Sequence, residues 1–167
     1  MNAKKIISIM LVFCWMIMMF GFSGQQGEGS GNLSRTVCEI IIDIVNIRNK
    51  YTDVEAENMI KVLEPYIRKI AHYAIYTLGG TLIANCIYQF CKETKKIINI
   101  STIIGVIYAI TDELHQLMIA GRSGKINDVI IDSLGVVTGI IFFLTVNQIG
   151  ILLKKKKYNF KGGEKCL

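Results

Sequence analysis

Charge and proline are scarce in this chain of 167 residues, and both shortages point the same way. Only 19% of the residues are charged and a single one is proline, whereas roughly a quarter of the residues in a soluble domain are charged. Hydrophobic residues make up 51% of the chain, and its mean hydropathy is +0.42. This balance argues against an ordinary soluble domain and favours a membrane protein. The length is enough for one domain.

Motifs typical of cofactor-binding sites or of catalytic nucleophiles are also missing. The sequence contains no Cys/His metal-ligand spacing, no glycine-rich phosphate loop and no G-x-S-x-G elbow. We therefore expect no metal and no cofactor, and no residue can be assigned a catalytic role. The lysine run 154–157 contains no aromatic residue and has Tyr158 beside it, whereas single-stranded nucleic acids are bound where aromatic side chains are interspersed with the basic ones. We expect no nucleic-acid partner.

What the sequence does contain is four apolar runs, each long enough to cross a bilayer, which takes roughly 20 residues. Inside lipid only a helix or a closed barrel satisfies the backbone, and none of the runs alternates with the period of two that a strand requires. We predict an all-α integral membrane four-helix bundle that forms a single domain over residues 1–167. The expected helices cover about 6–22, 71–91, 97–119 and 126–153.

The first apolar run has an alternative interpretation as a secretory signal peptide. Lys4 and Lys5 precede it, and the small residues Gly21, Ser23 and Gly24 follow it. Its apolar stretch, however, is longer than the core of about 7 to 15 residues that is typical of such peptides. We therefore favour an uncleaved membrane helix.

The short charged segments predict an orientation. Lysines precede the first run (Lys4 and Lys5), join the second to the third (92–96) and follow the fourth (154–157). Cytoplasmic loops carry an excess of Lys and Arg, and four spans put all three segments on the same side. We expect a multi-pass protein of the cytoplasmic membrane with both termini in the cytoplasm, a cytoplasmic tail over 154–167 and an outer loop over 23–70.

The outer loop carries two helix signals of its own. Apolar residues recur on one face of 34–49, as in an amphipathic helix. Thr52 and Glu55 have the spacing of a capping box, and Pro65 should end or kink the helix that starts there. We expect short amphipathic helices on the outer membrane surface, with a loosely ordered loop as the alternative.

Acidic side chains interrupt the ends of the third and fourth runs. At 1.5 Å per residue, Asp112 lies roughly 10 Å below the outer end of its helix and Asp132 about 9 Å below the outer end of the next. An ionised carboxylate in such a place costs on the order of 2.5 to 3.5 kcal/mol and normally faces a bundle interior or a wet cavity. Glu113 lies about 100° around the helix from Asp112, so the two cannot both be idle on a lipid-facing surface.

Helical spacing predicts that all four spans bring polar side chains to one level near the outer surface. Arg122, in a glycine-flanked turn, is suited to binding an anionic headgroup. Simpler roles remain open for three of these residues: His72 as an anchor of its helix, Asp128 as a cap of the next helix, and Arg122 as a clamp on Asp128. The candidate binding pocket consists of Ser23, Gln25, Lys69, His72, Tyr76, Asp112, Glu113, His115, Gln116, Arg122, Asp128 and Asp132.

Several of these residues occur in motifs that resemble those of the VanZ-like family. The motifs are Phe22-Ser23-Gly24-Gln25 with Ser30 and Ser34, the segment 68–73 with Tyr76, Asp112 to Gln116, Gly121 to Gly124, and Asp128, Asp132, Gly135 and Gly139. The resemblance covers nearly the whole chain. Two positions depart from the family pattern: Ala120 stands where proline is common, and Ile75 stands where many members have an acid.

The resemblance implies a bacterial envelope protein connected with lowered susceptibility to the glycopeptide teicoplanin, but it supplies no molecular activity. Three classes of function stay open. The outer pocket could bind a lipid headgroup, a lipid-linked wall intermediate or the antibiotic itself. The clustered carboxylates could instead carry out acid/base catalysis on an amphiphilic lipid. The chain could also be a structural accessory subunit whose polar cluster holds the bundle together.

Overall fold

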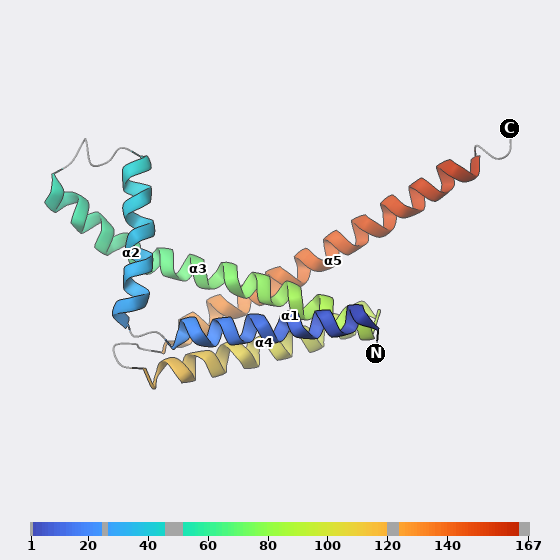
Figure 1. Ribbon diagram of the computed structural model, residues 1–167, viewed down its shortest axis with the longest axis horizontal. Helices are drawn as coiled ribbons and strands as arrows, with labels where there is room; N and C mark the ends of the chain where they lie inside the picture. Colours follow the sequence, from blue (N-terminus) through green and yellow to red (C-terminus); the bar gives the residue numbers. More distant parts are fainter. Residues whose placement is uncertain (1, 25–26, 46–51, 120–123, 164–167) are drawn as a thin grey trace.

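Five α-helices make up the part of the chain that the structure, a computed structural model, describes: residues 2–24, 27–45, 52–119 and 124–163 (Figure 1). The helices are α1 (Ala3–Ser23), α2 (Gly27–Ile44), α3 (Asp53–Phe90), α4 (Thr94–Gln116) and α5 (Ile126–Gly163). Four of them, α1, α3, α4 and α5, are long and apolar enough to cross a membrane. The predicted all-α membrane fold with four spans is confirmed.

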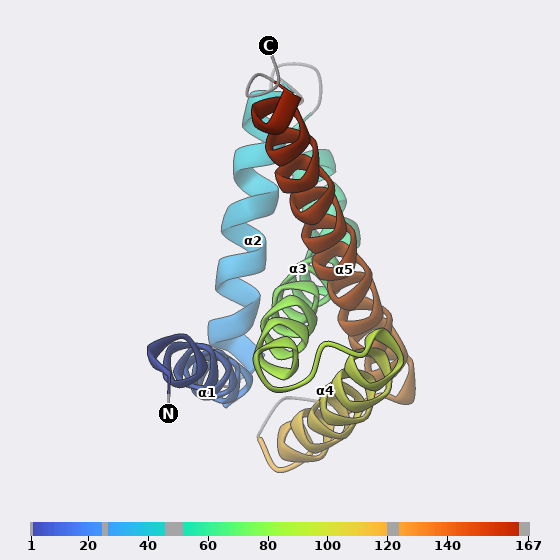
Figure 2. The same ribbon diagram turned by 90° about the vertical axis from the view of Figure 1, so that its right-hand side faces the viewer.

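Helix α3 lies at the centre of the arrangement and packs against each of the other four helices (Figure 2). Trp15 of α1 is buried in this core, where its indole N–H donates to the carbonyl oxygen of Ile75 at 3.1 Å. Tyr108 of α4 donates its hydroxyl to the carbonyl oxygen of Met16 at 2.6 Å. These two bonds tie α1 to its neighbours through backbone groups, which interact strongly where water is absent.

Small residues let α3 and α5 approach closely. A Cβ atom added at Gly139 would overlap the carbonyl group of Thr77, and one added at Gly80 would overlap the backbone of Val136. Thr81 also donates its hydroxyl to the carbonyl oxygen of Gly139 at 3.1 Å. The contact predicted from the Gly135 and Gly139 spacing therefore exists, and its partner is α3.

The described part of the expected outer loop, residues 23–70, is largely helical, but it is divided differently from our expectation. Thr52 and Glu55 form the predicted capping box, yet the helix that begins there neither ends at Pro65 nor is separate from the second span. Cys38 and Ile42 of α2 pack against Ile60 of α3. This packing stabilises the outer turns of α3 despite the backbone hydrogen bond that proline removes.

Helix α2 runs crosswise to the spanning helices at one end of the bundle (Figure 1). We expected a helix over 34–49 and the structure has one over Gly27–Ile44; residues 46–51 lie outside the described part of the chain. The apolar side chains that we placed on one face remain exposed, among them Ile40 and Ile44. This position and this exposed apolar face fit a helix lying on the membrane surface.

At the other end of the bundle the lysine-rich segments gather. The start of α1, the connection between α3 and α4 and the distal half of α5 all lie toward that end (Figure 1). Lys5 lies 4.7 Å from the centre of the Phe90 ring, which places the first residues of α1 beside the end of α3. Helix α5 also continues beyond the expected boundary at residue 153 and ends at Gly163, so that most of the expected tail is helical.

Candidate functional site

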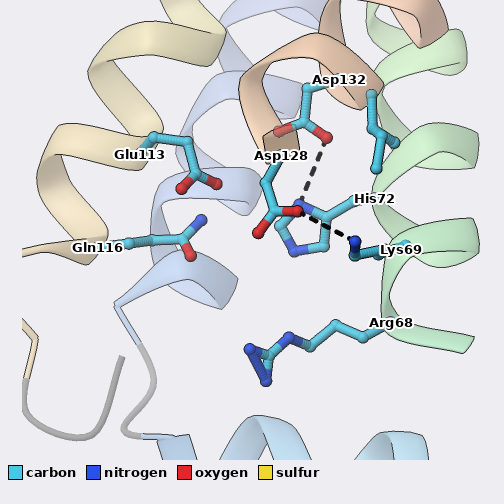
Figure 3. A pocket seen from close by; sticks show the side chains of 8 residues that line it. Arg68, Lys69, His72, Glu113, Gln116, Asp128 and Asp132 are labelled. Carbon is cyan, nitrogen blue, oxygen red and sulfur yellow. Dashed lines mark ion pairs between the residues drawn. The ribbon is translucent and has the colours of Figure 1, made fainter. Parts of the chain in front are cut away.

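A small polar cavity lies between α3, α4 and α5 at the end of the bundle that α2 crosses. Its volume is about 20 Å³, which is room for roughly one water molecule. Figure 3 shows side chains from all three helices reaching toward this space. The cavity is lined by Arg68, Lys69 and His72 of α3, Glu113 and Gln116 of α4, and Asp128, Ile131 and Asp132 of α5.

Two ion pairs connect α3 to α5 within the site (Figure 3). His72 Nδ1 lies 3.6 Å from Asp132 Oδ1, and the Asp132 side chain is completely buried. Lys69 Nζ lies 3.8 Å from Asp128 Oδ1, nearer the surface. The inner pair is shielded from water and the outer one is partly exposed, so the inner pair interacts through a lower dielectric.

The acids of α4 are held in different ways. Gln116 donates to Asp112 Oδ2 at 3.2 Å, one helical turn away. Glu113 Oε2 accepts the backbone N–H of Lys125 at 2.9 Å, which fixes the carboxylate beside the start of α5. Both acids are buried, as expected of carboxylates that face the interior of a bundle or a wet cavity.

Many polar atoms of this cluster have no hydrogen-bond partner among the residues that the structure describes. They include Asp112 Oδ1, both carboxylate oxygens of Asp132, Glu113 Oε1 and the Tyr76 hydroxyl. Tyr76 is fully buried, with its ring 5.8 Å from that of Trp15 in an edge-to-face arrangement. Buried polar atoms are nearly always paired, so this group is suited to a ligand, an ion or water.

Four of the expected pocket residues that the structure describes do not line the cavity. Two of them, Tyr76 and Asp112, are buried, and a carboxylate oxygen of Asp112 lies within 4.8 Å of His72 and Asp132. The other two are His115 and Ser23. His115 shares a helix face with Asp112 in the sequence, but its ring stacks on Phe20 of α1 with 4.0 Å between the ring centres. Ser23, at the end of α1, is buried with an unpaired hydroxyl and does not line the cavity. Gln25 and Arg122 lie outside the described residues.

One charged residue that lines the cavity was missing from our expectation. Arg68 stands four residues before His72, and this spacing puts both side chains on the same face of α3. The signal was therefore present in the sequence, beside Lys69. Arg68 brings a second positive charge to the mouth of the cavity (Figure 3).

An apolar groove adjoins the polar cavity and lies between α4 and the start of α5. Its volume is about 370 Å³, within the range of small-molecule sites. Glu113 lines both spaces. The other residues that line the groove are Ile110, Leu114, Leu117, Gly124, Lys125, Ile126 and Val129.

Comparison with known proteins agrees with this architecture and with the sequence motifs. The model of the VanZ/LLP1 family matches residues 8–147, which include all four membrane-spanning segments in whole or in part and every residue of the cavity. No match is found among curated proteins or among solved structures. On the strength of the family match, the chain belongs to the VanZ/LLP1 family.

Proposed function

We propose that this multi-pass membrane protein binds an amphiphile that has an anionic headgroup and at least one hydrocarbon chain. The observation that carries the proposal is the position of Glu113, which lines both the polar cavity and the apolar groove. A ligand that occupies both spaces needs a polar part and an apolar part joined at this point. Membrane lipids and lipid-linked wall intermediates have this construction.

The headgroup would bind at the mouth of the cavity, because the interior is too small for it. At about 20 Å³ the interior admits a water molecule or a bare ion. Arg68 and Lys69 stand at the mouth (Figure 3), and a guanidinium beside an ammonium favours a phosphate or a carboxylate. Arg122, which lies outside the described residues, is proposed from the sequence alone to bind the same headgroup.

The hydrocarbon chain would occupy the groove between α4 and α5. Apart from Glu113 and Lys125, the groove is lined by glycine and aliphatic side chains. Such a surface offers a chain close contact without a polar group to desolvate. A chain lying there would be continuous with the outer leaflet if the lysine-rich end of the bundle is cytoplasmic.

In this orientation the site would lie in the bacterial cytoplasmic membrane, on the side that glycopeptide antibiotics reach. We propose that sequestering a lipid or a lipid-linked wall intermediate there contributes to teicoplanin resistance. The VanZ/LLP1 family match supports this connection. Teicoplanin itself is a second ligand to test, because it too carries a hydrocarbon chain and ionisable groups.

Native mass spectrometry of the purified protein released from nanodiscs tests lipid binding. With phosphatidylglycerol as the probe, we expect bound lipid, and Arg68→Gln and Lys69→Gln should each weaken binding about tenfold or more, which corresponds to about 1.4 kcal/mol or more. Lys61→Gln removes the same charge from an exposed position of α3 that does not line the cavity, and should bind as the wild type does. Equal losses in all three variants would contradict a specific headgroup site.

A second pair of variants tests the groove. Leu114→Trp fills a position that lines the groove, and Leu134→Trp adds the same ring to an exposed position of α5 outside it. We expect lipid occupancy to fall only for Leu114→Trp. Unchanged occupancy in this variant would exclude the groove as the binding place of the chain.

The His72–Asp132 pair favours a second candidate function, a membrane-embedded acid/base enzyme. An imidazole held 3.6 Å from a buried carboxylate is an arrangement that can move a proton. Incubating the wild-type protein with a total lipid extract and comparing the lipids by mass spectrometry before and after tests this candidate. A product that forms with the wild type but not with His72→Gln supports catalysis, and no change in any lipid argues for binding alone.

A further inference from the structure

We propose that His72, Asp112 and Asp132 form a binding site for one divalent transition-metal ion at the inner end of the polar cavity. The three residues come from α3, α4 and α5 and are far apart in the sequence. One potential ligand atom from each lies within 4.8 Å of the other two. The site could not be predicted from the sequence, because no two of these residues have a recognisable metal-binding spacing.

The geometry of the three groups is close to that of a metal site. Ligand atoms about 2.0 to 2.2 Å from a tetrahedral Zn²⁺ lie about 3.4 Å apart, and His72 Nδ1 is 3.6 Å from Asp132 Oδ1. The third atom, an Asp112 carboxylate oxygen, lies within 4.8 Å of both, so each of its two distances would have to shorten by at most about 1.4 Å to reach the same value. A fourth position would face the cavity, where one water molecule fits.

Unpaired polar atoms at the same place are the second observation. Asp132 is completely buried and only 3% of Asp112 is exposed, yet Asp112 Oδ1 and both oxygens of Asp132 accept no hydrogen bond from the residues that the structure describes. The buried Tyr76 hydroxyl beside them also has no hydrogen-bond partner there. A cation bound between the carboxylates would satisfy these oxygens at once.

The balance of charge favours a cation as well. Three acids, Asp112, Glu113 and Asp132, lie in or beside the cavity. Among the described residues His72 makes an ion pair with Asp132 and Lys69 pairs with Asp128, whereas Arg68, which also lines the cavity, makes no ion pair with these three acids. Every unpaired carboxylate within a membrane span costs on the order of 2.5 to 3.5 kcal/mol. A divalent ion neutralises two of them where no lysine or arginine of the described residues is close enough.

The donors indicate the class of the ion. Carboxylates alone suit Mg²⁺ or Ca²⁺, whereas an imidazole together with carboxylates suits Mn²⁺, Fe²⁺ or Zn²⁺. We therefore expect Mn²⁺ and Zn²⁺ to bind and Mg²⁺ to compete poorly. This inference does not depend on lipid binding, and the experiment uses the metal alone.

Mn²⁺ titration of the purified full-length protein in detergent, followed by electron paramagnetic resonance, tests the site directly. The chain has two histidines, so a nitrogen coupling to bound Mn²⁺ indicates that the imidazole of one of them is a ligand. We expect about one tightly bound ion per chain with such a coupling, which His72→Gln abolishes and His115→Gln preserves. A bound ion without nitrogen coupling in the wild type, or no bound ion, would overturn the proposal without the need for any variant.

Two neighbouring acids provide a matched comparison for the carboxylate ligands. Asp112→Asn and Asp132→Asn should each weaken Mn²⁺ binding by about 10- to 100-fold or more. Asp128→Asn and Glu113→Gln remove the same charge nearby, and they should change the affinity by no more than a few fold. Equal weakening in all four would mean that the acids attract cations only through their summed charge, and the site would be rejected. Mn²⁺ should also raise the melting temperature of the wild type, and no such rise would count against the site.

Discussion

Asp132 is the residue on which the inner ion pair depends. It is completely buried, and its Oδ1 lies 3.6 Å from His72 Nδ1. Asp132→Ala leaves a half-buried imidazole without this partner, and we expect the free energy of unfolding to fall by about 1 to 3 kcal/mol. Thermal unfolding in detergent measures the change.

Asp128→Ala is the comparison for that variant, because it breaks the more exposed pair with Lys69, whose atoms are 3.8 Å apart. Partly exposed pairs contribute about 0 to 1 kcal/mol, so this change should be the smaller one. A larger loss at Asp128 than at Asp132 would mean that the outer pair, and not the inner one, stabilises the bundle.

At this scale, helical spacing predicts which side chains share a face but not which helix each will meet. Asp112, His115 and Gln116 occupy neighbouring positions of α4, and all three were expected in the pocket. His115 and Gln116 are adjacent in the sequence, and adjacent residues point in different directions around a helix. His115 therefore contacts Phe20 of α1, while Gln116 lines the cavity. Arg68 was missed although its spacing from His72 is just as regular.

The contact between α3 and α5 depends on glycine at single positions. An added Cβ at Gly139 would lie 2.7 Å from the backbone nitrogen of Thr81 and would also overlap the carbonyl group of Thr77. We expect Gly139→Ala to lower the free energy of unfolding by about 1 to 3 kcal/mol, because backbone cannot move aside as a flexible side chain can. Unfolding in detergent is again the measurement.

Gly150 of the same helix provides the control, because a Cβ added there meets nothing within 4 Å. Alanine is a better helix former than glycine by about 1 kcal/mol, so Gly150→Ala should be neutral or slightly stabilising. If both variants behave alike, close packing at Gly139 is not what holds the two helices together.

The sequence predicted the existence of the elements better than their ends. Hydrophobic runs and capping signals identified four spans and the start of α3 at Thr52. These local signals could not predict that α3 continues through Pro65. The continuation depends on the packing of α2 on α3, which compensates for the proline and is a tertiary contact. The extension of α5 to Gly163 was missed because we ended the helix where the apolar stretch ends, at the lysine run. That run marks the end of the apolar stretch only, since a helix can continue into water.

On the scale of the whole molecule, the lysine-rich segments lie at one end and the polar site at the other (Figure 1). The excess of lysine predicts that this end is cytoplasmic. Reporter fusions after Lys96 and after Lys157 should therefore both report the cytoplasm, and one near Asn49 should report the outside. An external signal at Lys96 would reverse the orientation and move the site to the inner leaflet.

The convergence of polar side chains could be predicted because each span carries them at a similar depth. The cavity itself could not, since its shape depends on how closely α3 and α5 approach. The adjoining groove depends in the same way on how α4 meets the start of α5. These distances are set by side-chain packing between residues far apart in the sequence.

We propose above all that Glu113, where the cavity and the groove meet, belongs to a functional binding site and does not serve only the packing of the bundle. Glu113→Gln keeps the shape of the side chain and an oxygen that can accept the Lys125 N–H bond, but removes the charge. The most direct test is teicoplanin susceptibility of cells that make equal amounts of wild type, Glu113→Gln or the exposed control Glu93→Gln. We predict that wild type and Glu93→Gln lower susceptibility, while Glu113→Gln, folded and equally abundant, leaves it at the level of cells without the protein. Protection by Glu113→Gln equal to that of the wild type would contradict the account.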